Sequence, residues 1–344
     1  MSRTMDLSVT LDYTQDVVAL LPEIRALESA GVDGLWIQEG YSFDAVSAIG
    51  FLAAHTGRIR LGTAILNVFS RSPALLAMTA AGCDHLSGGQ FSLGLGSSGP
   101  QVVEGFHGVG YDRPLTRIRE TIDVCRKVWR REPLRYEGRT VTVPLTERGR
   151  PLKLVNQPVR PAVPVYWAAL GDRSVTAAAE TADGWLPFFF VPERSDRAFG
   201  DALRDGAKRR DPVLGALDVV AHVDVAVGEG LDADRLLAPA RSRIALYVGG
   251  MGSRQSNYYN ALARRMGWER EAAEIQDHFL AGRRAEAAAA VPAEWLSLGN
   301  LVGPESWIAE RLAAFAESGV STLDITVIGG AEPAETVEIL RRLM

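Results

Sequence analysis

The sequence predicts an α/β fold, and within that class a single (β/α)8 TIM barrel. Eight short apolar runs alternate along the chain with segments of helical periodicity, which is the order of parallel strands and their covering helices. The 344 residues suit one barrel with insertions. No Ser-, Gly- or Pro-rich linker divides the chain into two domains. We therefore predict one barrel domain over residues 1–344.

Strands are predicted where apolar runs are bounded by turn residues. These runs lie at 7–11, 34–38, 59–66, 91–96, 164–170, 184–190, 217–227 and 322–328. Helices are predicted where apolar residues recur every three to four positions. These segments lie at 14–30, 43–55, 73–86, 117–130, 172–182, 193–210, 304–318 and 332–343.

Two stretches interrupt this alternation. Residues 131–162 contain the run RYEGRTVTV, which predicts a short hairpin insertion after strand four, turning near Glu137 and Gly138. Residues 233–290 have helical character throughout and are too long for one barrel helix. We expect them to form a helical insertion after strand seven.

Composition excludes several classes of protein. The chain has 37 Lys and Arg against 42 Asp and Glu, and this net charge of −5 disfavours non-specific nucleic-acid binding. The two cysteines, Cys83 and Cys125, cannot make a disulfide-stapled secreted scaffold. The N-terminal residues carry acidic groups where a signal peptide needs an apolar core, and no run is apolar enough to cross a bilayer. We expect a cytoplasmic protein without nucleic-acid or membrane partners.

A barrel of this kind carries its active site at the C-terminal ends of the strands. Tyr13 follows strand one, Glu39 follows strand two and Asn67 follows strand three. Glu39 is the carboxylate best placed for proton transfer, although a helix-capping or salt-bridging role explains its position equally well. The five histidines form no HxH or HExxH pattern, so no metal site is expected.

The run GLGSSGPQVVEGFHG at 94–108 follows strand four. Its glycines allow a ligand to approach backbone N–H groups, and its serines add hydroxyl donors. It is neither a phosphate-binding P-loop nor a convincing dinucleotide fingerprint, and a tight turn is the simpler alternative. His107 lies in this run and is a candidate acid or base.

The run AALGDRSVTAAAE at 168–180 ends strand five and opens a helix. The N-terminus of a helix can bind a phosphate through free N–H groups, here near Gly171 and Ser174. The local sequence alone favours a plainer interpretation, in which Asp172 is the N-cap of the helix.

Taken together, several segments resemble the luciferase-like monooxygenase superfamily, in its branch of F420-dependent oxidoreductases. The resemblance spans almost the whole chain and is carried by GLWIQEGY (34–41), RIRLGTAI (58–65), 71–108, RPLTRIRE (113–120), PLKLVNQPVRP (151–161), 164–190, ALYVGGMG with NYYN (245–260) and LVGPE (301–305). The run at 94–108 and the segment ALYVGGMG are the parts most specific to one subgroup.

The resemblance implies that the barrel mouth holds coenzyme F420, a deazaflavin, with FMN as the alternative cofactor. It implies a non-proline cis peptide and a bulge behind the ring, at Thr63, Ala64 and Ile65, with the cis bond between the last two. It further implies that the cofactor is lined by Gly96, Ser97 and Ser98, and that its phosphate is held by Ala169, Leu170, Gly171 and Ser174. Arg71, Arg113 and Arg173 are the expected partners of the acidic tail.

Two departures from the family pattern bear on the reaction. Many relatives have Asp-His after strand two, where this chain has Glu39-Gly40. Sugar-phosphate dehydrogenases of the branch carry a glutamate after strand four, near the place of Gly99-Pro100. The resemblance therefore favours a reductase that transfers hydride to an activated C=C or C=N bond of a small molecule. Glu39, Tyr13 or His107 would supply the proton.

Two other functions compete with this prediction. One is an FMN-dependent luciferase-like monooxygenase on the same barrel, and the other is a cofactor-free relative that acts in binding or assembly. In relatives the helical insertion covers the mouth, so the substrate pocket could be lined by Asn257, Tyr258, Tyr259 and Asn260. Relatives are often dimers, which leaves a homodimer as one of the open oligomeric states.

Overall fold

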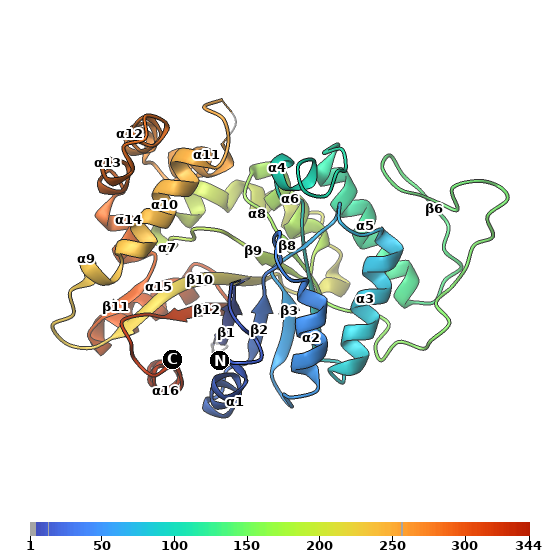
Figure 1. The fold of residues 1–344 in the computed structure, drawn as a ribbon, viewed down its shortest axis with the longest axis horizontal. Helices are drawn as coiled ribbons and strands as arrows, with labels where there is room; N and C mark the ends of the chain where they lie inside the picture. Colours follow the sequence, from blue (N-terminus) through green and yellow to red (C-terminus); the bar gives the residue numbers. More distant parts are fainter. Residues whose placement is uncertain (1–4, 13, 256) are drawn as a thin grey trace.

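The computed structural model describes residues 5–12, 14–255 and 257–344. Its strands are β1 (Asp6–Leu11), β2 (Gly34–Ile37), β3 (Arg60–Thr63), β4 (Leu66–Asn67), β5 (Phe91–Gly96), β6 (Tyr136–Glu137), β7 (Thr142–Val143), β8 (Val165–Ala168), β9 (Gly184–Leu186), β10 (Asp218–Val227), β11 (Leu301–Gly303) and β12 (Thr322–Val327). Eight of these close into a parallel barrel in the order β1-β2-β3-β5-β8-β9-β10-β12, and β12 pairs with β1 (Figure 1). The predicted TIM barrel is confirmed.

Helices surround the barrel (Figure 1). They are α1 (Leu21–Ala30), α2 (Ala45–Ala53), α3 (Pro73–Leu86), α4 (Pro100–Val103), α5 (Pro114–Trp129), α6 (Asp172–Thr181), α7 (Pro192–Ser195), α8 (Asp201–Ala207), α9 (Ala233–Leu236), α10 (Ala238–Gly250), α11 (Tyr258–Arg265), α12 (Glu269–Leu280), α13 (Arg284–Ala289), α14 (Ala293–Leu298), α15 (Glu305–Glu317) and α16 (Pro333–Leu343). None of the helices in the described ranges combines the length and apolar character needed to span a membrane.

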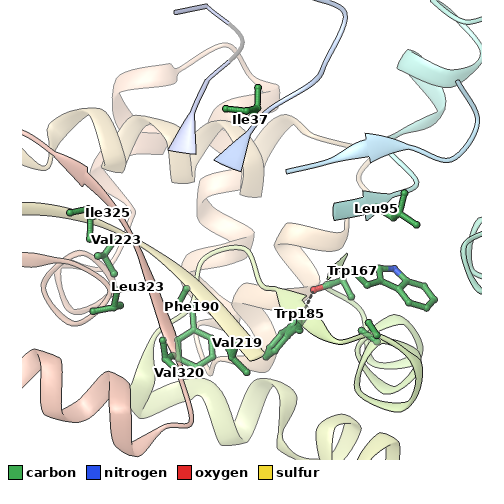
Figure 2. Packing of buried hydrophobic residues seen from close by; sticks show 14 of the residues in the cluster. Ile37, Leu95, Trp167, Trp185, Phe190, Val219, Val223, Val320, Leu323 and Ile325 are labelled. Atoms are coloured by element: carbon green, nitrogen blue, oxygen red, sulfur yellow. Dashed lines mark hydrogen bonds between the residues drawn. The ribbon is translucent and has the colours of Figure 1, made fainter. Parts of the chain in front are cut away.

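The core lies between the outer face of the barrel and these helices. Strand residues that point outward are almost fully buried, because the helices cover them. Figure 2 shows part of this layer, where Trp185, Phe190 and Val219 gather near the closure of the barrel. The indole N–H of Trp185 donates to the carbonyl oxygen of Ala169 at 2.9 Å, so even the largest core side chain satisfies its polar atom.

Both predicted insertions are present and lie on opposite sides of the barrel (Figure 1). The helices α9 to α14 gather on one side, and the antiparallel hairpin of β6 and β7 projects from the other. The hairpin turn is held by Glu120 of α5, whose carboxylate accepts the backbone N–H groups of Arg139, Thr140 and Val141 at 2.7 to 2.9 Å.

Most strands differ from their predicted bounds by one or two residues at an end, and two strands differ by more. The strand expected at 59–66 divides into β3 and β4, because the chain bulges at Ala64 and Ile65 between them. The strand expected at 184–190 ends at Leu186, and the left-handed backbone of Phe189, with φ of +58°, cannot continue an extended strand.

Two further boundaries also differ. The short run Leu301–Gly303 forms an additional strand, β11, which pairs with the C-terminal part of β10 beside the barrel. Three residues were too few to predict a strand. The first helix, expected from residue 14, begins at Leu21, with Pro22 in its first turn, where a missing N–H group costs nothing.

One glycine of the barrel should tolerate no side chain. A Cβ at Gly94 would lie 1.7 Å from the carbonyl oxygen of Thr63, which is backbone and cannot move aside. We expect Gly94→Ala to lower the free energy of unfolding by about 3 kcal/mol. Gly50→Ala in α2 is the matched control, since a Cβ there meets nothing within 4 Å and should stabilise the helix by about 0.5–1 kcal/mol. Urea unfolding followed by circular dichroism measures both, and equal stabilities of the two variants would contradict the close approach.

Candidate active site

Aromatic side chains close the lumen of the barrel. The rings of Trp36 on β2 and Tyr166 on β8 meet edge to face with their centroids 4.8 Å apart, and Val220 of β10 belongs to the same cluster. A Cβ at Gly62 would lie 2.3 Å from Trp36, and one at Gly184 would lie 2.1 Å from Tyr166. These glycines leave the space that the rings occupy. The cluster forms a floor that confines a ligand to the C-terminal ends of the strands, where barrel active sites lie.

The predicted bulge lies on one wall above this floor. The peptide bond between Ala64 and Ile65 is cis, as expected, and Ala64 packs against the floor cluster. The buried hydroxyl of Thr63 donates to the carbonyl oxygen of Gly94 and accepts from its N–H group, both at 2.9 Å. A Cβ at Gly96 would meet the side chain of Ile65 at 2.8 Å. Thr63 and Gly96 therefore shape the bulge, and the Thr63 hydroxyl is already engaged within the protein.

A buried amide donor lies next to the bulge. Asn67 ends β4, is 6% exposed, and accepts the backbone N–H of Phe69 through its Oδ1 atom at 2.9 Å. Within the part of the chain that the structure describes, its Nδ2 group donates no hydrogen bond. Leaving such a donor unpaired costs about 1–3 kcal/mol. Asn67 is therefore a candidate to bind a polar atom of a ligand, a role that the sequence did not assign.

The loop after β5 contains Ser97 and Ser98, which were predicted to line the cofactor. Ser98 adopts a left-handed backbone conformation, with φ of +54°. The phenolic oxygen of Tyr111 lies 3.1 Å from both the Ser97 Oγ atom and the Ser98 carbonyl oxygen, and its ring packs against Phe69. These contacts fix the shape of the loop at the mouth.

The N-terminus of α6 was the predicted phosphate site. The N-cap residue is Gly171, not Asp172, so the N-cap interpretation of Asp172 is wrong. Among the described residues no side chain caps this end of α6, and the Ser174 hydroxyl donates to the Gly171 carbonyl oxygen at 2.7 Å. Arg265 of α11 reaches the same point, where it pairs with Asp172 and donates to the carbonyl oxygen of Leu170 at 2.5 Å. The Ser174 and Val175 N–H groups donate to the Gly171 carbonyl oxygen at 2.9 Å, so the N–H groups of Asp172 and Arg173 are the candidates to bind an anion at this end of α6.

Glu39 lies at the end of β2 and is only 9% exposed in its side chain. Its two carboxylate oxygens accept from Arg71 at 2.6 and 2.8 Å, and one of them also accepts the backbone N–H of Ala45 at the start of α2. Arg71 is further drawn to Asp44, 3.9 Å away. Glu39 is thus an acceptor in three hydrogen bonds. Its predicted role as a proton donor stays a prediction.

The other two predicted acids differ in how far the structure describes them. His107 is half-buried in the loop after α4, with its ring edge to face with Phe106 at 5.3 Å. Phe106 in turn lies 6.1 Å from the ring of Tyr41, in the loop after β2. Tyr13 lies outside the described residues.

A charged cluster on the wall opposite the bulge was missed by the sequence analysis. His222 of β10 lies in register with Asp324 of β12, and its Nδ1 atom is 2.9 Å from the Asp324 carboxylate. Its Nε2 atom is 3.6 Å from the carboxylate of Asp224, which also accepts from Arg243 of α10 at 2.9 Å. The His222 side chain is 37% exposed, whereas both carboxylates are buried.

Burial alone would lower the pKa of His222, but the carboxylates of Asp224 and Asp324 outweigh it and raise the pKa to about 9. The imidazole is therefore protonated at neutral pH. One signal for this cluster was available in the sequence: His222 and Asp224 are two residues apart on one strand, so both side chains point to the same face. Within a mainly apolar strand, a charged pair facing the lumen predicts a polar site rather than core.

The helical insertion contributes an aromatic cluster to the mouth. Tyr247 and Tyr259 pack with their centroids 4.7 Å apart, and both contact Phe188 after β9. Asn257 and Asn260, predicted to line a pocket, instead hold the insertion together: the first is the N-cap of α11 and both donate to backbone carbonyl groups. Tyr258 is exposed.

Comparison with known proteins assigns the chain to a family. The family described as luciferase-like monooxygenase matches residues 4–322. The chain belongs to this family. A Mycobacterium tuberculosis protein named as a candidate coenzyme F420-dependent oxidoreductase is 35% identical over 330 residues, 92% of each chain. The 5,10-methylenetetrahydromethanopterin reductase of Archaeoglobus fulgidus is 26% identical over 321 residues, again 92% of each. The predicted membership in the luciferase-like family, in its F420-dependent branch, is confirmed.

A solved structure supports the fold. The coenzyme F420-dependent tetrahydromethanopterin reductase of Methanopyrus kandleri aligns with a TM-score of 0.78 over 98% of this chain and 97% of that one, at 21% identity. The luciferase-like barrel described above is thus shared by a protein of low sequence identity.

The charged cluster makes the stability of the barrel depend on pH. Because the folded pKa of His222, about 9, exceeds the unfolded value of about 6.5, the stabilisation is fully present below pH 6.5 and is lost as pH rises through 9. We expect the urea midpoint to fall over this interval and His222→Gln to flatten the fall. His85→Gln, at an exposed position of α3, is the control and should titrate like the wild type. Identical pH profiles for both variants would contradict the charged state of His222.

Proposed function

We propose that the protein is an F420-dependent reductase, which transfers a hydride from reduced deazaflavin to an activated C=C or C=N bond of a small molecule. Membership in the luciferase-like family and two relatives with coenzyme F420 in their names support this cofactor. The observation that carries the proposal is the unpartnered Nδ2 group of Asn67, buried beside the bulge at the barrel mouth. Together with the uncapped end of α6, it gives the mouth donors for both a ring and a phosphate.

The residues at the mouth fit a deazaflavin in chemical type. The Asn67 amide would donate to a polar edge of the ring, and Gly96 presents no side chain toward the bulge. The N–H groups that open α6, after Gly171, would bind the phosphate. When bound, the reduced cofactor supplies the hydride. The aromatic floor of Trp36 and Tyr166 excludes water from below.

Arginines near the mouth suit the acidic tail of the cofactor. Arg113 and Arg173 are exposed, and the carboxylate next to Arg113 belongs to Asp112, which is exposed as well. Arg71 is less available, because Glu39 already occupies it. We therefore expect Arg113 and Arg173, rather than Arg71, to pair with the tail.

The family resemblance also supports a direction for the reaction. This chain has Glu39-Gly40 after β2 and Gly99-Pro100 after β5. By the resemblance, many relatives have Asp-His at the first place, and sugar-phosphate dehydrogenases of the branch have a glutamate near the second. An alcohol substrate needs a base to take its hydroxyl proton, whereas an unsaturated substrate needs a donor. This difference supports reduction of a C=C or C=N bond. An FMN-dependent monooxygenase of the same family, or a cofactor-free binding protein, would differ in the ligand that the purified protein takes up.

Coenzyme binding tests this proposal. Coenzyme F420 should bind with micromolar or lower Kd, measured through quenching of its fluorescence, and FMN should bind more weakly. Gly171→Val should raise the Kd for F420 about tenfold or more by blocking close approach of the phosphate. The fold should accept this valine, because a Cβ at Gly171 comes no nearer than 3.8 Å to another residue's atom, Ser174 Oγ.

The matched control is Gly57→Val, in the loop before β3 at the other end of the barrel, which should bind as the wild type does. Wild-type affinity of Gly171→Val would refute the phosphate assignment. A bound yellow flavin would favour the monooxygenase, and no change with either cofactor would favour the binding protein.

A homodimer is the assembly that we infer. Leu75, Met78 and Leu86 are exposed along one face of α3, and the exposed Gly82 continues the same stripe at helical spacing. Such a stripe suits a packed helix interface. Sedimentation at micromolar concentration should therefore give twice the chain mass of 37.2 kDa. Met78→Glu should shift the protein toward the monomer, and an unchanged mass would place the interface elsewhere.

A further inference from the structure

The His222 cluster contains hydrogen bonds that the packing of the barrel strands does not require. The Asp324 carboxylate accepts hydrogen bonds from the Thr10 hydroxyl at 2.7 Å and the Ser8 hydroxyl at 3.1 Å. The Nδ1 atom of His222 lies 2.9 Å from the same carboxylate. These partners come from β1 and β10, the two strands that flank β12. The Asp324 carboxylate is therefore fixed from both sides, and it fixes the orientation of the imidazole ring.

Within the described ranges, the other nitrogen of His222 has no such short partner. Its Nε2 atom is 3.6 Å from Asp224, which is too far for a good hydrogen bond. Asp224 is held instead by Arg243 at 2.9 Å and through its backbone N–H, which donates to Asn300 at 2.9 Å. Arg243 binds the Oδ2 atom of this carboxylate, whereas Nε2 of His222 lies 3.6 Å from the Oδ1 atom. The Nε2 proton is therefore the less tightly bound of the two imidazole protons.

His222 also lies opposite the bulge. In the barrel order, three strands separate β3 from β10 in either direction, so the two strands form opposite walls. Ala64 at the bulge and Val220 on β10 both pack in the floor cluster. His222 is the next residue of β10 whose side chain points into the lumen, two positions beyond Val220. Ala64 and His222 therefore stand across the lumen from each other, immediately above the floor.

We propose that His222 is the catalytic acid of the reductase, and that it donates its Nε2 proton to the substrate atom next to the one that receives the hydride. This inference rests on the proposed function. A substrate held between a ring on the bulge and the opposite wall has one face toward the hydride and the other toward His222. Asp324 is the positioning residue of the pair.

The step balances. One carbon of the C=C or C=N bond receives the hydride, and the neighbouring carbon or nitrogen takes the proton as the double bond becomes single. A bound reduced deazaflavin would supply the two electrons of the hydride and lose its remaining proton to solvent, and the substrate would be reduced by two electrons. His222 is left as a neutral imidazole, still bound to Asp324 through Nδ1–H, and recovers its proton from solvent. A positioned acid contributes roughly 10²–10⁴-fold to such a step.

The charges around His222 suit this role better than those around Glu39. Among the described residues, His222 faces Asp224 on its own strand, Asp324 on β12 and, beyond Asp224, Arg243 on α10. Its charged form carries the proton to be given. Both carboxylate oxygens of Glu39 are bound to the Arg71 guanidinium, so this side chain is already engaged within the protein.

The test uses full-length protein loaded with reduced F420 and a probe set of simple enones and cyclic imines, beginning with 2-cyclohexen-1-one. His222→Gln should lower the single-turnover rate of hydride transfer by about 100-fold or more, while the Kd for F420 stays within about twofold. Glu39→Gln should change that rate less than tenfold. A rate for His222→Gln within tenfold of wild type would overturn the inference, as would a larger loss in Glu39→Gln.

A second variant keeps His222 in place. Asp324→Asn should lower the pH at which the hydride-transfer rate declines, and in cofactor-free protein it should lower the midpoint of the His222 imidazole signals in NMR titration. Unchanged midpoints in Asp324→Asn would overturn the positioning role, and with it the inference. Failure of the wild type to bind F420, or to reduce any probe, would instead overturn the proposed function.

Discussion

The close approach of β3 and β5 at Thr63 and Gly94 is the constraint on which the site depends. The Thr63 hydroxyl occupies both backbone groups of Gly94, and the Thr63 carbonyl lies where a Cβ would be. Strand pairing along the normal ladder ends there, and the chain departs into the bulge before β4 resumes pairing with β5. The bulge in turn sets the place of Asn67 and of the side chain that covers Gly96. One contact between two strands thereby determines the geometry of one wall of the mouth.

Much of the fold could be predicted because buried parallel strands have sequences that are apolar runs, and the chain has such a run for every strand of the barrel. The boundaries failed where backbone conformation, rather than apolarity, ended an element, as at Phe189 with its left-handed backbone. The bulge at Ala64 could be expected only from the family resemblance, since nothing in the run TAIL distinguishes it from an ordinary strand.

The site shows a different limit. Glu39 could be placed at the end of a strand from sequence, but its partner could not, because Arg71 is 32 residues away and meets it only in the folded barrel. His222 was overlooked because it lies within a strand and because its role depends on Asp324, which is 102 residues later in the sequence. Pairing across a closed barrel joins residues whose separation in sequence carries no signal. Only the polar character of one face of β10 could have been predicted from the sequence.

The helical insertion is anchored to the barrel at two functional points. Arg243 of α10 holds Asp224 on β10, and Arg265 of α11 holds Asp172 and the Leu170 carbonyl oxygen at the start of α6. An attempt to change substrate range by exchanging this segment for that of a relative would therefore disturb both the proposed proton donor and the proposed phosphate site. A graft should therefore keep these two arginines. Alternatively, it should replace the two arginines and their aspartate partners together.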